Sequence, residues 1–322
     1  MSNRIVFKII VPNEMVTAKN MVSWLENLLL FQPDTMVSGD LFGRKELNFD
    51  KALLLNRMNK KSLNRMSISL NSNKEDFVVR KGRYQAMISG RLKIEDDQEI
   101  KIISNRIEEI FLSYEGIVAF IADASDSFWQ NNTDIKQYEL IGKSQEHIVI
   151  ISDPIIKSNK IVDIEQLPGH SHFTKDLWFG SCWRMWFGEG YYPYIPKKIL
   201  SNINSCFENI EVENNSMRIT LYPSIWEYND PRNRNLQWLF RIQAGMDVVS
   251  DWLRAREDET KDNSNASIEI FDEQHCVNGG IKLIKYYYDE DKQCVSKKIA
   301  KVCLSMEIDN SGNVVWEELL LV

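Results

Sequence analysis

Two histidines separated by one residue, His170 and His172 in the sequence GHSH, are the pair in this chain best suited to hold a metal ion. Side chains two residues apart on a strand project to the same face, so both imidazoles would reach one ion. Asp176 is among the nearby acidic residues that would complete the set. No further cysteines or histidines at metal-ligand spacing accompany them. The favoured interpretation is therefore that both histidines lie in a loop, where they pack against other residues or cap an element. We expect no metal and no cofactor, with His170, His172 and Asp176 as the alternative metal site.

Cys182 suggests a second chemistry, in which a thiol nucleophile is activated by His170 or His172. That reaction needs the thiolate and the imidazole in hydrogen-bond contact, together with donors for an oxyanion. Cys182 lies among tryptophans, where a thiol is usually a small apolar filler, and no cysteine-hydrolase signature surrounds it. A metal-dependent or thiol hydrolase at these residues is therefore the alternative function, and the pattern favours a protein that is not an enzyme.

Two carboxylates, Asp123 and Asp126, follow the apolar run at residues 116–122. Aspartates after a buried strand line the active sites of some α/β folds. An aspartate in this position is also the ordinary way to begin a helix, because its carboxylate accepts a hydrogen bond from the first free N–H groups. We interpret the pair as helix caps.

Residues 178–194, WFGSCWRMWFGEGYYPY, contain eight aromatic side chains. In a single strand, alternate residues from Phe179 to Phe187 form an apolar face that is predicted to be core. The opposite face carries Trp178, Arg184 and Trp186, a composition typical of a protein-binding hot spot if exposed and of a central strand if buried. The predicted protein-binding residues are Trp178, Arg184, Trp186, Tyr191, Tyr192 and Trp226.

The elements that must position these residues follow an α+β pattern. Residues 1–125 alternate as strand, helix, two strands, helix and strand, the order of a ferredoxin-like split βαβ unit with an antiparallel sheet and helices on one face. Residues 161–256 repeat strand, helix, strand, helix, which admits a second such unit, with a long helix at 235–256. The tail predicts β-hairpins, with a turn at residues 310–313.

Two domains are expected, residues 1–158 and residues 159–322, the second containing the aromatic-rich strand and the terminal hairpins. The segment 257–266, EDETKDNSNA, has no apolar residue before its last position. Such a polar, acidic stretch is predicted to be an exposed loop.

Composition limits the classes of partner. The chain has 322 residues, 43% of them hydrophobic and 26% charged, and a net charge of −7. The acidic balance argues against nucleic-acid binding, which needs a basic surface for the phosphates. No apolar run is long enough to span a membrane. The start of the chain lacks a signal-peptide cleavage site, and the five cysteines show no disulfide or zinc pattern, so we expect a cytoplasmic protein.

The acidic charge, the composition rich in Lys, Asn and Ile, and the stretch LWFGSCWRMWFGE without a catalytic set resemble bacterial toxin-immunity and phage-conflict proteins, such as the type VI secretion immunity families. The resemblance implies a factor that binds and neutralises another protein, such as a basic toxin or defence protein. It carries over no site residues. A structural subunit of a larger assembly is the second alternative, and the oligomeric state stays open.

Overall fold

The computed structural model describes residues 3–43, 45–61, 65–73, 75–153, 158–261, 268–290, 295, 297, 300–310 and 312–321, with the side chains of residues 255–261 and 268 left out. Contacts divide the chain into two compact units. Unit one combines residues 1–131 with 167–251, and unit two combines residues 132–166 with 252–322.

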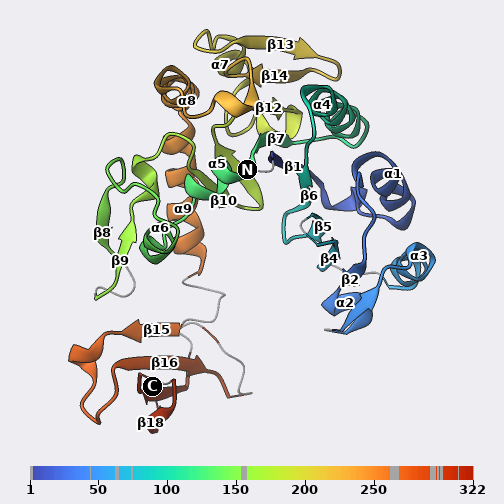
Figure 1. The fold of residues 1–322 in the computed structure, drawn as a ribbon. Helices are drawn as coiled ribbons and strands as arrows, with labels where there is room; N and C mark the ends of the chain where they lie inside the picture. Colours follow the sequence, from blue (N-terminus) through green and yellow to red (C-terminus); the bar gives the residue numbers. More distant parts are fainter. Residues whose placement is uncertain are drawn as a thin grey trace. The chain divides into compact units, whose positions relative to one another are not determined.

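A ten-stranded antiparallel sheet is the centre of unit one, in the order β13-β14-β12-β7-β1-β6-β5-β4-β2-β3 (Figure 1). Its strands are β1 (Arg4–Pro12), β2 (Thr35–Val37), β3 (Glu46–Asn48), β4 (Met66–Asn71), β5 (Asp76–Lys81), β6 (Gln85–Lys93), β7 (Val118–Asp123), β12 (Arg184–Phe187), β13 (Glu208–Val212) and β14 (Ser216–Thr220). A separate hairpin consists of β10 (Ser171–Thr174) and β11 (Leu177–Gly180).

The helices of unit one form where apolar residues recur at three-to-four spacing and a side chain caps the first turn. In α4, Asp96 accepts a hydrogen bond from the backbone N–H of Glu99, and Ile100, Ile103 and Ile107 are on the buried stripe. The helices are α1 (Ala18–Leu28), α2 (Gly39–Phe42), α3 (Lys51–Lys60), α4 (Asp97–Ser113), α5 (Ala124–Trp129), α7 (Lys197–Ser201), α8 (Pro231–Ala244) and the start of α9 (Met246–Lys261), with 3-10 turns η1 (Asn13–Met15), η3 (Glu189–Tyr191) and η4 (Ile225–Glu227).

The α+β class with antiparallel sheets is confirmed. The adjacent strands β7, β1, β6 and β5 have the strand order of a split βαβ unit, with α1 and α4 as its helices. Strand β5 is an element that the sequence pattern does not predict. Strands β4, β2 and β3 extend the sheet beyond this unit.

A second split βαβ unit does not form in the described residues of the second half. Strand β12 pairs with β7, and β14 and β13 follow it, so these strands lengthen the first sheet. The two compact units therefore differ from the predicted division between residues 158 and 159, since strands from both sides of that position belong to one sheet.

The two faces of the sheet contact different elements. Lys8 and Phe120 lie opposite each other on β1 and β7, and this face meets the β10–β11 hairpin, where the Lys8 ammonium lies over the Phe173 ring. The other face meets α4, since Arg184 and Trp186 of β12 donate hydrogen bonds to side chains of that helix. The sheet core is thus covered on both sides.

The long helix expected at residues 235–256 is two helices. Gly245 adopts a left-handed conformation with φ 65° and closes α8, as glycine does at helix ends. Ile242, in the last turn of α8, is 72% exposed. The predicted exposed loop at 257–266 is wrong for residues 257–261, which continue α9, while residues 262–266 lie outside the described residues.

Unit two contains two separate sheets, a two-stranded one and a four-stranded one in the order β15-β16-β17-β18. Its elements are α6 (Ile135–Leu140), β8 (Ile150–Ser152), β9 (Lys160–Val162), η2 (Ile164–Gln166), β15 (Ile268–Phe271), η5 (Glu273–His275), β16 (Lys282–Tyr288), β17 (Val302–Ile308) and β18 (Val314–Leu321). The predicted hairpin strands at the end of the chain are present. Among the described helices of the whole chain, none is long and apolar enough to cross a membrane.

Candidate functional site

The aromatic segment is divided between two strands, so it does not present a single face. Strand β11 belongs to the hairpin and β12 to the main sheet. Trp178 is 2% exposed and stacks on Phe120, with ring centroids 4.4 Å apart. Phe120 pairs with Met185, so Trp186, the next residue, points to the opposite face of the sheet.

Trp186 and Arg184 belong to a polar network beneath α4. Trp186 is fully buried and donates its indole N–H to Glu108 at 2.7 Å. Arg184 donates to Ser104 at 2.7 Å and to Thr220 at 2.9 Å, and Arg218 pairs with Glu108 at 2.8 Å. Of the two alternatives for the face of Trp178, Arg184 and Trp186, the structure shows the buried one, because both tryptophans fill the core.

The other predicted binding residues lie in different surroundings. Tyr191 is fully buried and donates its hydroxyl to the Trp178 carbonyl oxygen, so it belongs to the core. Tyr192 and Trp226 are half-buried. Tyr192 donates to the Asn215 carbonyl oxygen at 2.6 Å, and the Trp226 indole donates to Asp97 at 3.2 Å.

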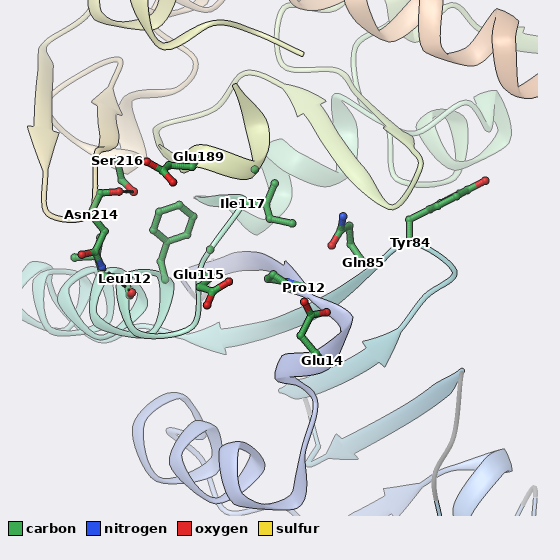
Figure 2. A pocket seen from close by; sticks show the side chains of 13 residues that line it. Pro12, Glu14, Tyr84, Gln85, Leu112, Glu115, Ile117, Glu189, Asn214 and Ser216 are labelled. Atoms are coloured by element: carbon green, nitrogen blue, oxygen red, sulfur yellow. Dashed lines mark hydrogen bonds between the residues drawn. The ribbon is translucent and has the colours of Figure 1, made fainter. Parts of the chain in front are cut away.

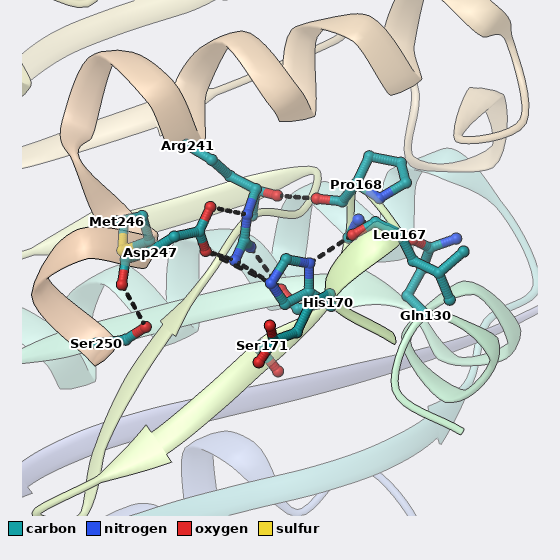
Figure 3. Close-up of polar contacts among 12 residues, drawn as sticks. Gln130, Leu167, Pro168, His170, Ser171, Arg241, Met246, Asp247 and Ser250 are labelled. Carbon is teal, nitrogen blue, oxygen red and sulfur yellow. Dashed lines mark hydrogen bonds and ion pairs between the residues drawn. The ribbon is translucent and has the colours of Figure 1, made fainter. Parts of the chain in front are cut away.

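His170 is part of a buried network with Arg241 and Asp247 (Figure 3). Its Nδ1 lies 2.5 Å from the Leu167 carbonyl oxygen, which places the ring proton on Nδ1. Its Nε2 then accepts from the Arg241 guanidinium at 2.6 Å, and Arg241 also donates to the His170 carbonyl oxygen and to Asp247. Arg241 is 1% exposed, so this network ties α8 and α9 to the start of the hairpin.

The alternative metal set is not assembled. His170 uses both ring nitrogens in the network just described, and the Asp176 carboxylate accepts from the backbone N–H of Tyr84 at 2.7 Å and of Gln85 at 3.3 Å. The rings of His170 and His172 are 5.3 Å apart. Within the described part of the chain, no group of three or more His, Cys, Asp or Glu residues is arranged to hold a metal ion.

Cys182 does not form a nucleophile pair with either histidine. The thiol is buried and donates to the Arg184 carbonyl oxygen at 3.7 Å. Burial raises the pKa of Cys182 well above its ordinary value, and the negative charge of Asp126 raises it further. A thiol held in its protonated form is a poor nucleophile, so the alternative thiol-hydrolase site is not supported by this geometry.

Asp123 acts as the capping interpretation predicts, whereas Asp126 lies inside the helix and forms an ion pair. The Asp123 carboxylate accepts from the backbone N–H of Asp126 at 2.8 Å and caps α5. Asp126 is 4% exposed and pairs with Arg234 at 2.6 Å, an ion pair that joins α5 to α8. Both carboxylates are used in holding elements together.

The network around Arg241 predicts a pH-dependent stability. Burial raises the pKa of Asp247, but the hydrogen bonds and the positive charge of Arg241 outweigh burial and hold that pKa below its ordinary value of 3.8. A carboxylate with a depressed folded-state pKa stabilises fully above its unfolded pKa and loses that contribution as the pH falls through the folded one. Asp247→Asn should therefore lower the urea midpoint near neutral pH, by an amount that shrinks as the pH falls from about 5 to about 2. A difference that does not change with pH would contradict this assignment.

A cavity of about 520 Å³ opens at the edge of unit one where β1, β6 and β7 meet (Figure 2). Three glutamates from separate segments line it: Glu14 in η1, Glu115 between α4 and β7, and Glu189 in η3. All three are exposed to solvent. The full lining is Pro12, Glu14, Tyr84, Gln85, Phe111, Leu112, Glu115, Gly116, Ile117, Glu189, Gly190, Asn214 and Ser216, which includes no lysine, arginine or histidine.

Hydrogen bonds hold the cavity walls in place. Asn214 donates to the Leu112 carbonyl oxygen at 3.0 Å, and Asn215 donates to Glu189 at 2.8 Å. Both asparagines have a positive φ, 54° and 56°, in the β13–β14 turn. Burial, together with the charges of Glu211 and Glu189, raises the pKa of the nearby Tyr192. Hydrogen bonds therefore join the cavity walls, and the three lining glutamates give the cavity its negative charge.

The sequence did not identify this cavity because its carboxylates come from distant loops. Two glycines allow the close approach that shapes it: a Cβ at Gly188 would lie 2.0 Å from the Gly116 carbonyl oxygen, and one at Gly116 would meet the Phe111 ring at 2.1 Å. Gly116 and Gly188 are 72 residues apart, so neither indicates the other in the sequence. Arg241, also missed, does leave a signal, since it falls on the same helical stripe as Gln237, Phe240 and Ala244.

In comparisons with known proteins, no family model and no curated protein matches the chain. One solved structure with partial similarity is the toxic C-terminal tip of CdiA from Pseudomonas aeruginosa in complex with its immune protein. The match has 10% sequence identity, covers 38% of this chain and 87% of the other, and has a TM-score of 0.25. A similarity of this size does not establish a shared fold.

Proposed function

We propose that this protein acts by binding another protein, and that the acidic cavity receives a basic side chain of that partner. The observation that carries the proposal is the set of Glu14, Glu115 and Glu189 around a cavity of about 520 Å³ without a basic lining residue. A volume of this size lies in the range of ligand pockets, and carboxylates around it favour a cation. Lysine and arginine side chains of a partner have the matching charge and length.

The candidate catalytic residues favour a binding role over an enzymatic one, because their side chains are used in structural contacts. His170 and Cys182 are engaged in buried structural contacts, and Asp176 holds the β5–β6 turn. Tyr192 contacts Asn215, which in turn contacts Glu189, so we propose Tyr192 as a further contact beside the cavity. We propose Trp226, which is half-buried on η4, as a second residue that contacts the partner protein.

Within protein binding, we propose neutralisation of a basic toxin or defence protein. The support is the compositional resemblance to toxin-immunity proteins, together with an acidic cavity that fits a basic partner. If a toxin gene lies beside the gene for this protein, co-expression of the protein with that toxin should restore the growth of the host cells. If growth rescue persists when the cavity glutamates are replaced, neutralisation does not depend on the cavity.

The cavity itself is tested by charge removal. The triple variant Glu14→Gln, Glu115→Gln, Glu189→Gln should weaken binding of a fluorescent lysine-rich peptide about tenfold or more, because three carboxylates no longer attract it. The binding should also weaken with salt. The measurement is fluorescence anisotropy at fixed ionic strength.

The matched control carries the same change in net charge on exposed glutamates elsewhere in unit one, Glu46→Gln, Glu109→Gln, Glu227→Gln. Equal losses in the cavity variant and the control would mean that the peptide senses only net charge, and would overturn the cavity as the site. Used as paired baits, the two variants also identify the partner: it is the protein retained by the control and lost by the cavity variant.

A further inference from the structure

The four-stranded sheet of unit two has two faces of opposite character. Residues paired across strands share a face, so Ile284, Met306 and Glu317 lie in one row, and Tyr286, Leu304 and Leu319 in the next. This face, which we call the aliphatic face, continues through Tyr288, Val302 and Leu321. Apart from Lys282 and Glu317, its described side chains are apolar.

The opposite face is covered by its own connections. Tyr287, Ala300 and Cys303 form a buried cluster there. The Glu307 carboxylate, 1% exposed, accepts from the backbone N–H groups of Val277, Asn278 and Gly280 and so fastens the loop before β16 over the sheet.

Within unit two, the aliphatic face has no such cover among the described residues. None of its described side chains is fully buried: those on β16 and β17 are half-buried, and Leu319 and Leu321 are 66% and 88% exposed. A sheet face this apolar is costly in water, and an apolar patch of several hundred Å² usually marks an interaction site. Strand β18 is an edge of this sheet as far as the described residues show its strands.

The charges on the aliphatic face favour a second copy of the same chain as its partner. The face carries one lysine and one glutamate, so it has no net charge to select the basic partner proposed for the acidic cavity. A two-fold axis along β17 would lay β16 of one copy over β18 of the other. Lys282 of one copy would then be displaced along the strand direction by two residues, roughly 7 Å, from Glu317 of the second copy. The two long side chains can bridge this displacement.

The overlap has the size of a weak dimer interface. With the axis along β17, the strands β16, β17 and β18 of one copy lie over β18, β17 and β16 of the other, and β15 lies outside the overlap. Three strands about 4.8 Å apart and about seven residues long span roughly 14 by 23 Å, so two stacked faces bury roughly 650 Å² in projection. An interface of this size is small, so we expect weak association at micromolar concentrations. The low charge and high aliphatic content are typical of self-association surfaces.

We propose that the protein forms a two-fold dimer by stacking the aliphatic faces of two copies into a sandwich. The dimer is independent of the acidic cavity, which lies in unit one. Failure of the cavity proposal therefore leaves the dimer untouched.

Sedimentation velocity of the full chain over about 1–100 µM tests the dimer. The expected result is a species of twice 37.6 kDa. Leu319→Glu should weaken it about tenfold or more, because a charge enters an apolar interface. Leu319 is exposed, so the variant keeps its fold, which an unchanged thermal unfolding midpoint would verify. Val248→Glu, at a residue 74% exposed in unit one, is the matched control and should leave the dimer intact.

Charge exchange tests the two-fold arrangement. Lys282→Glu and Glu317→Lys should each weaken the dimer, and the double variant should recover it because the opposite charges face each other again. A chain that stays monomeric throughout, or a dimer unaffected by Leu319→Glu, would overturn the proposal. A dimer weakened by Leu319→Glu but not rescued by the double exchange would overturn the two-fold axis along β17.

Discussion

Replacement of Arg241 by methionine should lower the free energy of unfolding of unit one by about 3 kcal/mol. The guanidinium is buried and donates to the His170 carbonyl oxygen at 2.6 Å and to its Nε2 at 2.6 Å. Methionine fills much of the same volume but donates nothing, so these buried acceptors and Asp247 lose their partner. The cost of unsatisfied buried groups exceeds the gain from a more apolar side chain.

Urea unfolding followed by circular dichroism measures this effect. The control is Arg232→Met in the same helix, because Arg232 is exposed and its ion pair with Asp230 lies on the surface. Exposed pairs contribute little, so this change should alter stability by less than about 1 kcal/mol. Similar small effects at both positions would show that the network around Arg241 does not hold α8 and α9 to the hairpin.

Trp186→Ala should destabilise unit one by about 3–5 kcal/mol. Trp186 is fully buried between β12 and α4, and the change leaves a large cavity and removes the hydrogen bond from the indole to Glu108. This is the strongest stability effect that we expect from the aromatic segment. It follows from its position in the core, the buried one of the two alternatives that the sequence pattern left open.

Trp226→Ala is the matched comparison, since this tryptophan is half-buried and its indole donates to Asp97 near the surface. We expect a loss below about 1 kcal/mol. Calorimetric unfolding of both variants measures the difference. A Trp186→Ala protein with the stability of the parent chain would instead return Trp186 to the candidate binding residues.

The N-terminal part of the fold was predictable because its information is local. Periodicity placed the α4 stripe of Ile100, Ile103 and Ile107, and the structure buries all three. The capping interpretation of Asp123 is likewise met by a hydrogen bond only three residues away. Helix stripes and caps depend on neighbours within a few residues, so they can be read without knowing the fold.

The aromatic segment shows where such reasoning fails. Alternation predicts one strand with two faces, but the chain bends between Gly180 and Arg184, and the two halves join different sheets. Burial of Trp178 and Trp186 then depends on Phe120 and Glu108, which lie on β7 and α4. Sequence alternation assigns side chains to faces only while the strand continues unbroken.

The sequence by itself determined the α+β class, the helices α1 and α4 between β1 and β7, the cap at Asp123, and the absence of a complete catalytic motif around Cys182. Only the tertiary structure decided that β12 joins β7, that Arg241 binds His170, and that Glu14, Glu115 and Glu189 surround one cavity. The physical reason is range: periodicity and capping act within a turn or a strand, whereas these contacts join residues about 60 to 175 positions apart, and their partners are set by how the whole chain packs.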